Sequence, residues 1–246
     1  MLNLIKAEFY KLRTSKIFWL MVLAGVGQGL VGPLASSHLR TRTGVDMVLF
    51  SIQTQQFLVY MPIVAIFGYF ISIEFHTGSL KNLIAYGHRR RDIIIAKSIV
   101  FYVGTVIISF IFPIVITLIS TILNGYGRNF NLQAILFILR VSFLMMLVYV
   151  GIGSILIMLS YITKNAFAPS VIFYLLDTVC RAGQMFSKKN DLVRAIYGKT
   201  VFYQLTTVTL KEITFSQALE VVVICLITIL FSTTVAMVAF NKAEIK

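Results

Sequence analysis

The chain has 246 residues, of which 58% are hydrophobic and only 13% are charged, and its mean hydropathy is +0.89. Soluble domains are roughly half apolar and a quarter charged, so this composition excludes an ordinary soluble protein and indicates an integral membrane protein. The net charge of +13 lies mostly between apolar runs, where basic residues report membrane topology, so nucleic acid is not expected as a partner.

Residues 1–16 form the first predicted element, an amphipathic helix that lies along the membrane interface. Leu2, Ile5, Phe9 and Leu12 recur at steps of three and four residues, with the basic residues largely off that stripe. The helix either anchors the chain to the inner leaflet or packs as an elbow against the next element. Residues 17–246 are expected to form one membrane domain, because they contain no polar segment long enough to build a soluble one.

Apolar runs long enough to cross the membrane define the predicted fold, which is all-α with six transmembrane helices. About 20 helical residues cross the ~30 Å hydrocarbon core. Because short basic connections stay inside, both termini and the segment after the second run are predicted to be cytoplasmic. The external loop 187–218 also carries several basic residues and fits this topology least well. The predicted spans are 17–36, 57–73, 98–123, 134–160, 166–186 and 219–240.

The segment 74–97, EFHTGSLKNLIAYGHRRRDIIIAK, is a polar interruption between the second and third runs. Thr77 or Ser79 is placed to cap a helix of about two turns, and Gly87 is placed to end it. A helix this short is unstable alone, so lipid headgroups or the groove of a partner are expected to receive its apolar face. That face is formed by Leu80, Leu83 and Ile84.

This segment resembles the signature region of the permeases of ABC type-2 (ABC-2) transporters. The family pattern is close to E-x-x-x-G-[ST]-L-x-x-L-x-x-x-x-x-x-R and is followed by a lysine that heads the third span. Arg89 and Arg91 are alternatives for the arginine position. The matching residues are Glu74, Gly78, Ser79, Leu80, Leu83, Arg90 and Lys97.

The resemblance implies that the short helix is a coupling helix, which docks on a separate ATPase subunit that binds ATP and Mg²⁺. Permeases of this family work in pairs, so a second permease chain, identical or sister, and membrane lipids are the other expected partners. Membrane topology alone also accounts for each arginine. The residues to which the resemblance assigns ATPase coupling are Glu74, Gly78, Ser79, Leu80, Leu83, Ile84, Gly87, Arg89, Arg90, Arg91 and Lys97.

Motifs for chemistry within the chain are not found, and we expect no catalytic, cofactor-binding or metal-binding residue. The GKT at 198–200 looks like the tail of a phosphate-binding loop, but Val193 stands where that loop requires glycine. Cys180 and Cys225 fall in apolar runs without the spacing of a metal site. The chain itself is therefore not expected to be an enzyme.

Charged residues inside the apolar runs are the candidate substrate path: Arg140, Asp177 and Arg181. A charged side chain in the bilayer core is energetically costly unless it is paired or hydrated. Charged residues in such a place therefore often mark a functional position. Asp177 and Arg181 lie four residues apart and can also form a purely structural ion pair, and Arg140 can extend its guanidinium to the interface.

The resemblance further implies an ATP-driven exporter of an amphipathic substrate in a bacterial plasma membrane. The chain looks similar to permeases for lantibiotic immunity, bacitracin resistance and phenol-soluble-modulin export in low-GC Gram-positive bacteria, so a membrane-active peptide is the expected substrate. Two alternatives remain open. In the first, the chain is a non-transporting scaffold or sensor that recruits a cytoplasmic regulator. In the second, it is an ion-coupled carrier, for which Asp177 is the only support.

Overall fold

The computed structural model describes residues 1–35, 39, 41–48, 50–51, 60–127, 131–187, 190–210 and 213–242. All the regular elements in these residues are helices. The labelled helices are α1 (Leu2–Thr14), α2 (Lys16–Ala35), α5 (Tyr60–Thr77), α6 (Ser79–Ala85), α7 (Arg90–Asn124), α8 (Leu132–Thr163), α9 (Ala168–Ser187), α10 (Asp191–Gly198), α11 (Val201–Val208) and α12 (Phe215–Asn241), and residues 44–48 and 50–51 are also helical.

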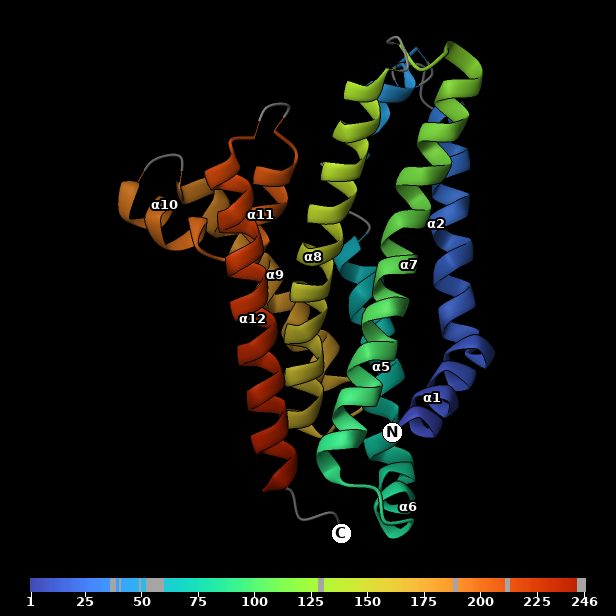
Figure 1. The fold of residues 1–246 in the computed structure, drawn as a ribbon, viewed down its shortest axis with the longest axis vertical. Coiled ribbons are helices and arrows are strands. Elements are labelled where there is room, and N and C mark those ends of the chain that lie inside the picture. The colour runs from blue at the N-terminus through green and yellow to red at the C-terminus, as the bar shows by residue number, and fades with distance from the viewer. Residues whose placement is uncertain are drawn as a thin grey trace.

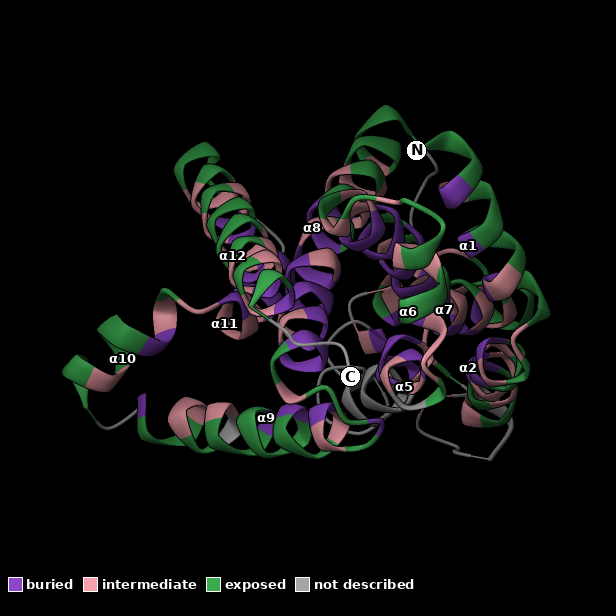
Figure 2. Ribbon diagram, turned by 90° about the horizontal axis from the view of Figure 1, so that it is seen from below, coloured by how far each residue is buried: buried purple, intermediate pink, exposed green. Residues whose placement is uncertain are grey.

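The long helices run side by side along the long axis of the molecule (Figure 1). The N-terminus, the C-terminal end of α12, α1 and α6 lie at one end of this bundle, which we call the terminal end. In the view along the bundle, α9 runs across the picture and is therefore strongly inclined to α5 and α7 (Figure 2). The N-terminus, the end of α12 and the predicted coupling helix thus share one side of the molecule.

Three helices, α7, α8 and α12, are long and apolar enough to cross a membrane by themselves. A fourth candidate is α1 followed by residues 16–32, which are bent by 56° at their junction. The all-helical membrane prediction is thereby confirmed, but six spans are not. The remaining predicted spans correspond to α5, which carries Glu74 and His76, and to α9, which carries Asp177 and Arg181, and these polar residues lower their hydropathy.

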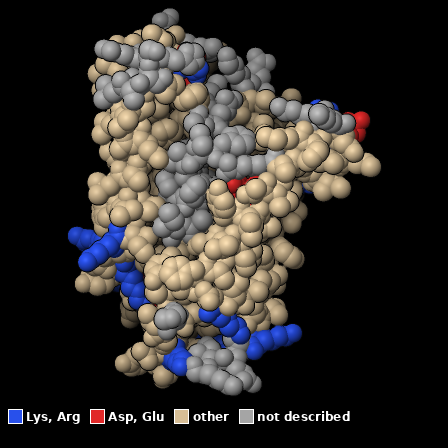
Figure 3. Space-filling view, turned by 180° about the vertical axis from the view of Figure 1, so that it is seen from behind, with Lys and Arg blue, Asp and Glu red and all other residues tan. Residues whose placement is uncertain are grey.

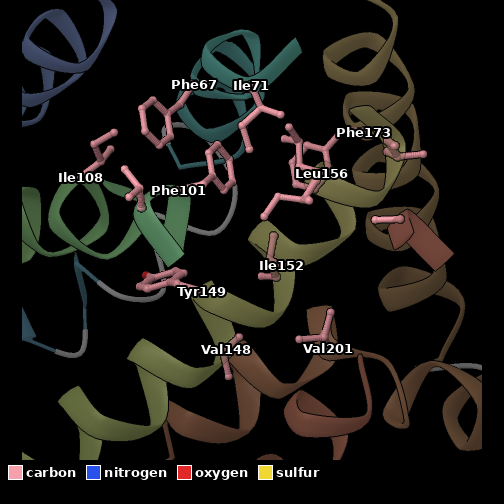
Figure 4. Close-up of a cluster of buried hydrophobic side chains, with 14 of the residues drawn as sticks. Phe67, Ile71, Phe101, Ile108, Val148, Tyr149, Ile152, Leu156, Phe173 and Val201 are labelled. Atoms are coloured by element: carbon pink, nitrogen blue, oxygen red, sulfur yellow. The ribbon is translucent and has the colours of Figure 1, made fainter. Parts of the chain in front are cut away.

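A core of aromatic and branched side chains holds α5, α7 and α8 together (Figure 4). Phe67 of α5 stacks on Phe101 of α7 with ring centroids 4.9 Å apart. The approach depends on Gly104, because a Cβ there would lie 2.6 Å from Cζ of Phe67. The core reaches close to the terminal end, where it also contains Leu80.

The G-x-x-x-G motif of α2 is used within the chain. A Cβ on Gly25 would lie 3.2 Å from Cγ2 of Ile111, and one on Gly29 would lie 2.7 Å from Cγ1 of Val115. Small residues let two helices approach closely in a membrane, and here the second helix is α7. The motif therefore already packs against α7 of the same chain and is not needed for contact with a second copy.

The predicted external loop 187–218 contains two helices, α10 and α11. Its GKT sequence closes α10 and opens α11, where the Thr200 hydroxyl accepts a hydrogen bond from the Tyr203 amide. Lys199 forms an ion pair of 2.5 Å with Glu220 on α12. Because Val201, Leu205 and Val208 are buried in the main core, this segment is part of the folded domain.

Candidate functional site

The candidate site is built around α6, which connects α5 to α7 at the terminal end (Figure 1). The predicted caps at Thr77 and Ser79 are wrong, because Gly78 is the N-cap and makes no side-chain hydrogen bond. Its φ of 69° is left-handed, a conformation that glycine adopts without a steric penalty. The sharp turn after α5 is therefore made by backbone geometry.

The other end of α6 stops as predicted, at Gly87. The Gly87 amide donates to the carbonyl of Ile84 at 2.9 Å, and the His88 amide donates to that of Leu83 at 3.3 Å. With a φ of 82° at Gly87, this is the Schellman arrangement that ends a helix. A glycine turn thus fixes α6 at each end.

The apolar face of α6 packs against the chain itself. Leu80 is buried in the main core, and Leu83 and Ile84 are half-buried against it. The expectation that a partner or lipid must receive this face is therefore wrong, because the core between α5 and α7 already does so. The opposite face of α6 and the turn after it expose Lys81, Asn82, Ala85 and Tyr86, and Tyr86 is 83% exposed.

Next to α6, four charged side chains close into a ring. Lys97 on α7 forms ion pairs with Glu74 on α5 and with Glu8 on α1, the latter at 3.0 Å. Lys11 on α1 completes it, with 2.8 Å to Glu8 and 3.1 Å to Glu74. Each carboxylate therefore lies between two ammonium groups, and the charged ring (Glu8, Lys11, Glu74 and Lys97) is neutral as a whole.

The charged ring is largely removed from solvent, since Glu8, Glu74 and Lys97 are buried and Lys11 is half-buried. The pKa of Lys11 is raised: burial lowers the pKa, but the carboxylates of Glu74 and Glu8 outweigh that effect. Buried charges persist only when their partners and geometry are good. The ring therefore fixes the relative positions of α1, the end of α5 and the beginning of α7, and so holds both connections of α6.

Glu8 and Lys11 were not singled out from the sequence. The predicted stripe of α1 was Leu2, Ile5, Phe9 and Leu12, but the buried residues are Leu4, Glu8 and Leu12, while Leu2 and Phe9 are exposed. The stripe therefore does not mark the face of α1 that packs against protein, because that face contains an acid whose partners lie on other helices, and the exposure of Leu2 and Phe9 agrees with the alternative in which the stripe anchors α1 in the inner leaflet. The usable sequence clue is that Glu8 is the only acidic residue before Asp46.

The three consecutive arginines have different surroundings. Arg89 and Arg91 are exposed, whereas Arg90 reaches the C-terminal end of α12. Its Nη1 donates to the carbonyl of Phe240 at 2.6 Å and to that of Asn241 at 3.0 Å, and its guanidinium lies 5.5 Å from the centre of the Phe240 ring. A cation here satisfies the free carbonyls and the negative end of the helix dipole.

We expect Arg90→Gln to speed amide hydrogen exchange in the last turn of α12 by roughly tenfold, because charge-assisted hydrogen bonds to its carbonyls are lost. Exchange followed by mass spectrometry on the full chain in nanodiscs measures this effect. Arg89→Gln and Arg91→Gln remove the same charge from exposed neighbours and are the matched controls. Equal acceleration in all three variants would show that charge at this end, rather than the Arg90 contact, orders α12.

The three residues of the candidate substrate path lie on two helices. Arg140 of α8 is half-buried, with its guanidinium 5.3 Å from the centre of the Phe137 ring. Asp177 of α9 is buried. The side chain of Arg181 lies outside the described residues, so its ion pair with Asp177 stays a prediction.

A family model described as ABC-2 family transporter protein matches residues 4–180. The chain belongs to the ABC-2 family. The match covers the charged ring and the helices from α1 to most of α9, and α12 lies beyond it. No curated protein and no solved structure matches the chain.

Family membership makes the chain a multi-pass membrane permease of an ABC-2 transporter. Such permeases lack the nucleotide-binding domain and imply an ATPase partner in general. Among the described residues, no group of three or more His, Cys, Asp or Glu side chains is placed to hold a metal ion.

Proposed function

We propose that this permease is the membrane subunit of an ATP-driven exporter that moves an amphipathic, membrane-active peptide out of the cytoplasm or the inner leaflet. Two permease chains, identical or sister, assemble with two ATPase subunits in a bacterial plasma membrane. In this arrangement each permease has six spans, of which α5 and α9 are the second and fifth. Both termini and α6 face the cytoplasm.

The observation that carries the proposal is the rigid connection of α6 to its neighbours. Leu80 and the glycine turns fix α6 on the core, and the charged ring ties the two flanking helices to each other and to α1. A flexible loop would dissipate a movement imposed on it, whereas a rigid element transmits it as a rotation of the attached helices. This is the mechanical property that a coupling helix needs.

The predicted coupling residues have different roles in this mechanism. Glu74, Gly78, Leu80, Leu83, Ile84, Gly87 and Lys97 shape and hold the segment from inside, together with Arg90 at the end of α12. Ser79 opens α6. Arg89 and Arg91 are exposed, and together with Lys81, Asn82 and Tyr86, which were not among the predicted residues, they form the surface available to an ATPase.

Two considerations support a membrane-active peptide as the substrate. The first consideration is the resemblance of the chain to lantibiotic-immunity and related permeases. The other is that α10 and α11 pack into the domain, which agrees with extraction of a substrate from the membrane without a large external receptor. Arg140, Asp177 and Arg181 are the proposed contacts for its charged groups.

The test is purification of the tagged chain from its native membranes in mild detergent, followed by assay of ATP hydrolysis in nanodiscs. We expect an ATPase subunit to co-purify and a cationic lantibiotic to raise hydrolysis at least twofold over a non-membrane-active peptide of equal charge. Absence of an ATPase beside a folded chain would favour the scaffold or the ion carrier. If Arg140→Ala and Asp177→Ala both leave the stimulation unchanged, the proposed substrate path is wrong.

A further inference from the structure

The outward face of α1 combines cations with exposed apolar side chains. Lys6 and Arg13 lie seven residues apart and therefore on the same side of the helix, opposite the buried Leu4, Glu8 and Leu12. Leu2 is 76% exposed and Tyr10 is 69% exposed on the same side. The apolar side chains of this face are poorly solvated by water alone. Its basic residues can be explained without a partner protein.

The cations on this face have no acidic neighbour in their own segment. Glu8 is the only acid before Asp46, and its carboxylate is buried between Lys11 and Lys97 in the charged ring. Lys6, Arg13 and Lys16 are all exposed. The ring thus neutralises the inner side of α1 and leaves its outer side wholly positive.

The exposed surface of α2 continues this face away from the terminal end. Trp19 is 51% exposed, and its indole Nε1 donates a 2.7 Å hydrogen bond to the carbonyl of Arg13, across the bend between α1 and α2. Leu20 and Leu23 beyond it are also exposed, as expected of a lipid-facing helix. In Figure 1, α1 lies beside the lower end of the bundle, and α6 projects further out.

Space-filling views place many lysines and arginines at the terminal end of the molecule (Figure 3). Tryptophan and tyrosine concentrate where hydrocarbon meets headgroups, and basic side chains there attract anionic lipids. We therefore take Trp19 as the level of the headgroups, where its indole contacts the carbonyl of Arg13 and where Lys16 begins the same helix three residues earlier.

We propose that Lys6, Arg13 and Lys16 form a binding surface for the headgroups of anionic phospholipids, with Leu2, Phe9 and Trp19 packed against the adjoining acyl chains. The partner is the membrane itself, recognised by the phosphate and net charge of its lipids. This surface is separate from α6 and does not require an ATPase, so its test stands apart from that of transport.

Trp19 is the single tryptophan of the chain and reports directly on this surface. The full chain is reconstituted in nanodiscs of phosphatidylcholine that contain either brominated phosphatidylglycerol or brominated phosphatidylcholine, and quenching of Trp19 fluorescence is compared. We expect phosphatidylglycerol to be enriched at Trp19 at least about fivefold at low salt, the ratio that about 1 kcal/mol from one basic residue provides. The enrichment should fall as salt screens the exposed charges.

The triple variant Lys6→Gln/Arg13→Gln/Lys16→Gln is expected to bring this enrichment close to unity. Lys81→Gln/Arg89→Gln/Arg91→Gln removes three exposed cations from the coupling segment and is the matched control, which should keep it. Equal quenching by both lipids in the wild type would overturn the proposal without any variant. So would an equal loss in both triple variants, which indicates a general charge effect, and so would shielding of Trp19 from both lipids, which indicates that a protein covers the face.

Discussion

Lys97→Ala should destabilise the permease more than any other single substitution considered above. It leaves the buried carboxylates of Glu8 and Glu74 with only the half-buried Lys11 between them. Removing one partner of a buried ion pair costs about 3–5 kcal/mol, because the remaining charge stays in a poorly solvating environment. The apparent unfolding midpoint in detergent should therefore fall by roughly 10 °C, measured at one scan rate because such unfolding is often irreversible.

Two further variants distinguish the effect of breaking the charged ring from the effect of losing any lysine. Lys81→Ala removes an exposed lysine from α6 and should leave the midpoint nearly unchanged. The double variant Glu74→Gln/Lys97→Met removes one acid and one base, so the neutral Glu8–Lys11 pair remains, and it should be more stable than Lys97→Ala. If Lys97→Ala and Lys81→Ala unfold at the same temperature, the ring does not stabilise the fold.

The sequence predicted best those elements that local pattern determines. The cores of α7, α8 and α12 are long apolar runs, and a run of this length has few alternatives to a membrane helix. Gly87 was expected to end α6 and does so, because the left-handed residue after a helix is usually glycine. Both successes depend on neighbours within a few residues.

The charged ring could not be predicted from local pattern, because its members lie far apart in the chain. Glu8 and Lys97 are 89 residues apart, and Glu74 and Lys11 are 63 apart. Apolar periodicity also fails to show which side of a membrane-associated helix meets protein, since lipid is as apolar as a protein core. This is why the predicted stripe of α1 included the exposed Leu2 and Phe9.

The contacts of the three consecutive arginines could not be predicted from local pattern either. In sequence, Arg89, Arg90 and Arg91 are equivalent as topology signals. Successive residues at the start of α7 are rotated by about 100° around its axis, so only Arg90 points to the end of α12. Because α12 lies outside the residues that match the ABC-2 family model, the motif itself contains no information about this contact.

Tyr86→Ala is expected to weaken association with the ATPase subunit by about 30-fold without destabilising the permease. Tyr86 follows α6 directly, is 83% exposed, and lies beside the exposed Lys81, Asn82 and Arg89. Large aromatic side chains at the centre of an interface often contribute 2 kcal/mol or more when truncated, which corresponds to that loss. The expectation rests on the proposed docking of α6 and is measured as ATPase retained on the tagged permease across a dilution series.

Phe215→Ala provides the matched control, because Phe215 is 84% exposed and begins α12, far from α6 along the bundle (Figure 1). Both substitutions remove an exposed aromatic ring, so a general effect on detergent binding or solubility would appear in both. Leu83→Asp is a poor substitute for Tyr86→Ala, since Leu83 packs against the core and its loss would confuse misfolding with lost docking. If Tyr86→Ala retains the ATPase as fully as Phe215→Ala does, the exposed side of α6 contacts lipid headgroups rather than the ATPase. The ATPase would then have to move the rigid segment through another surface of the permease.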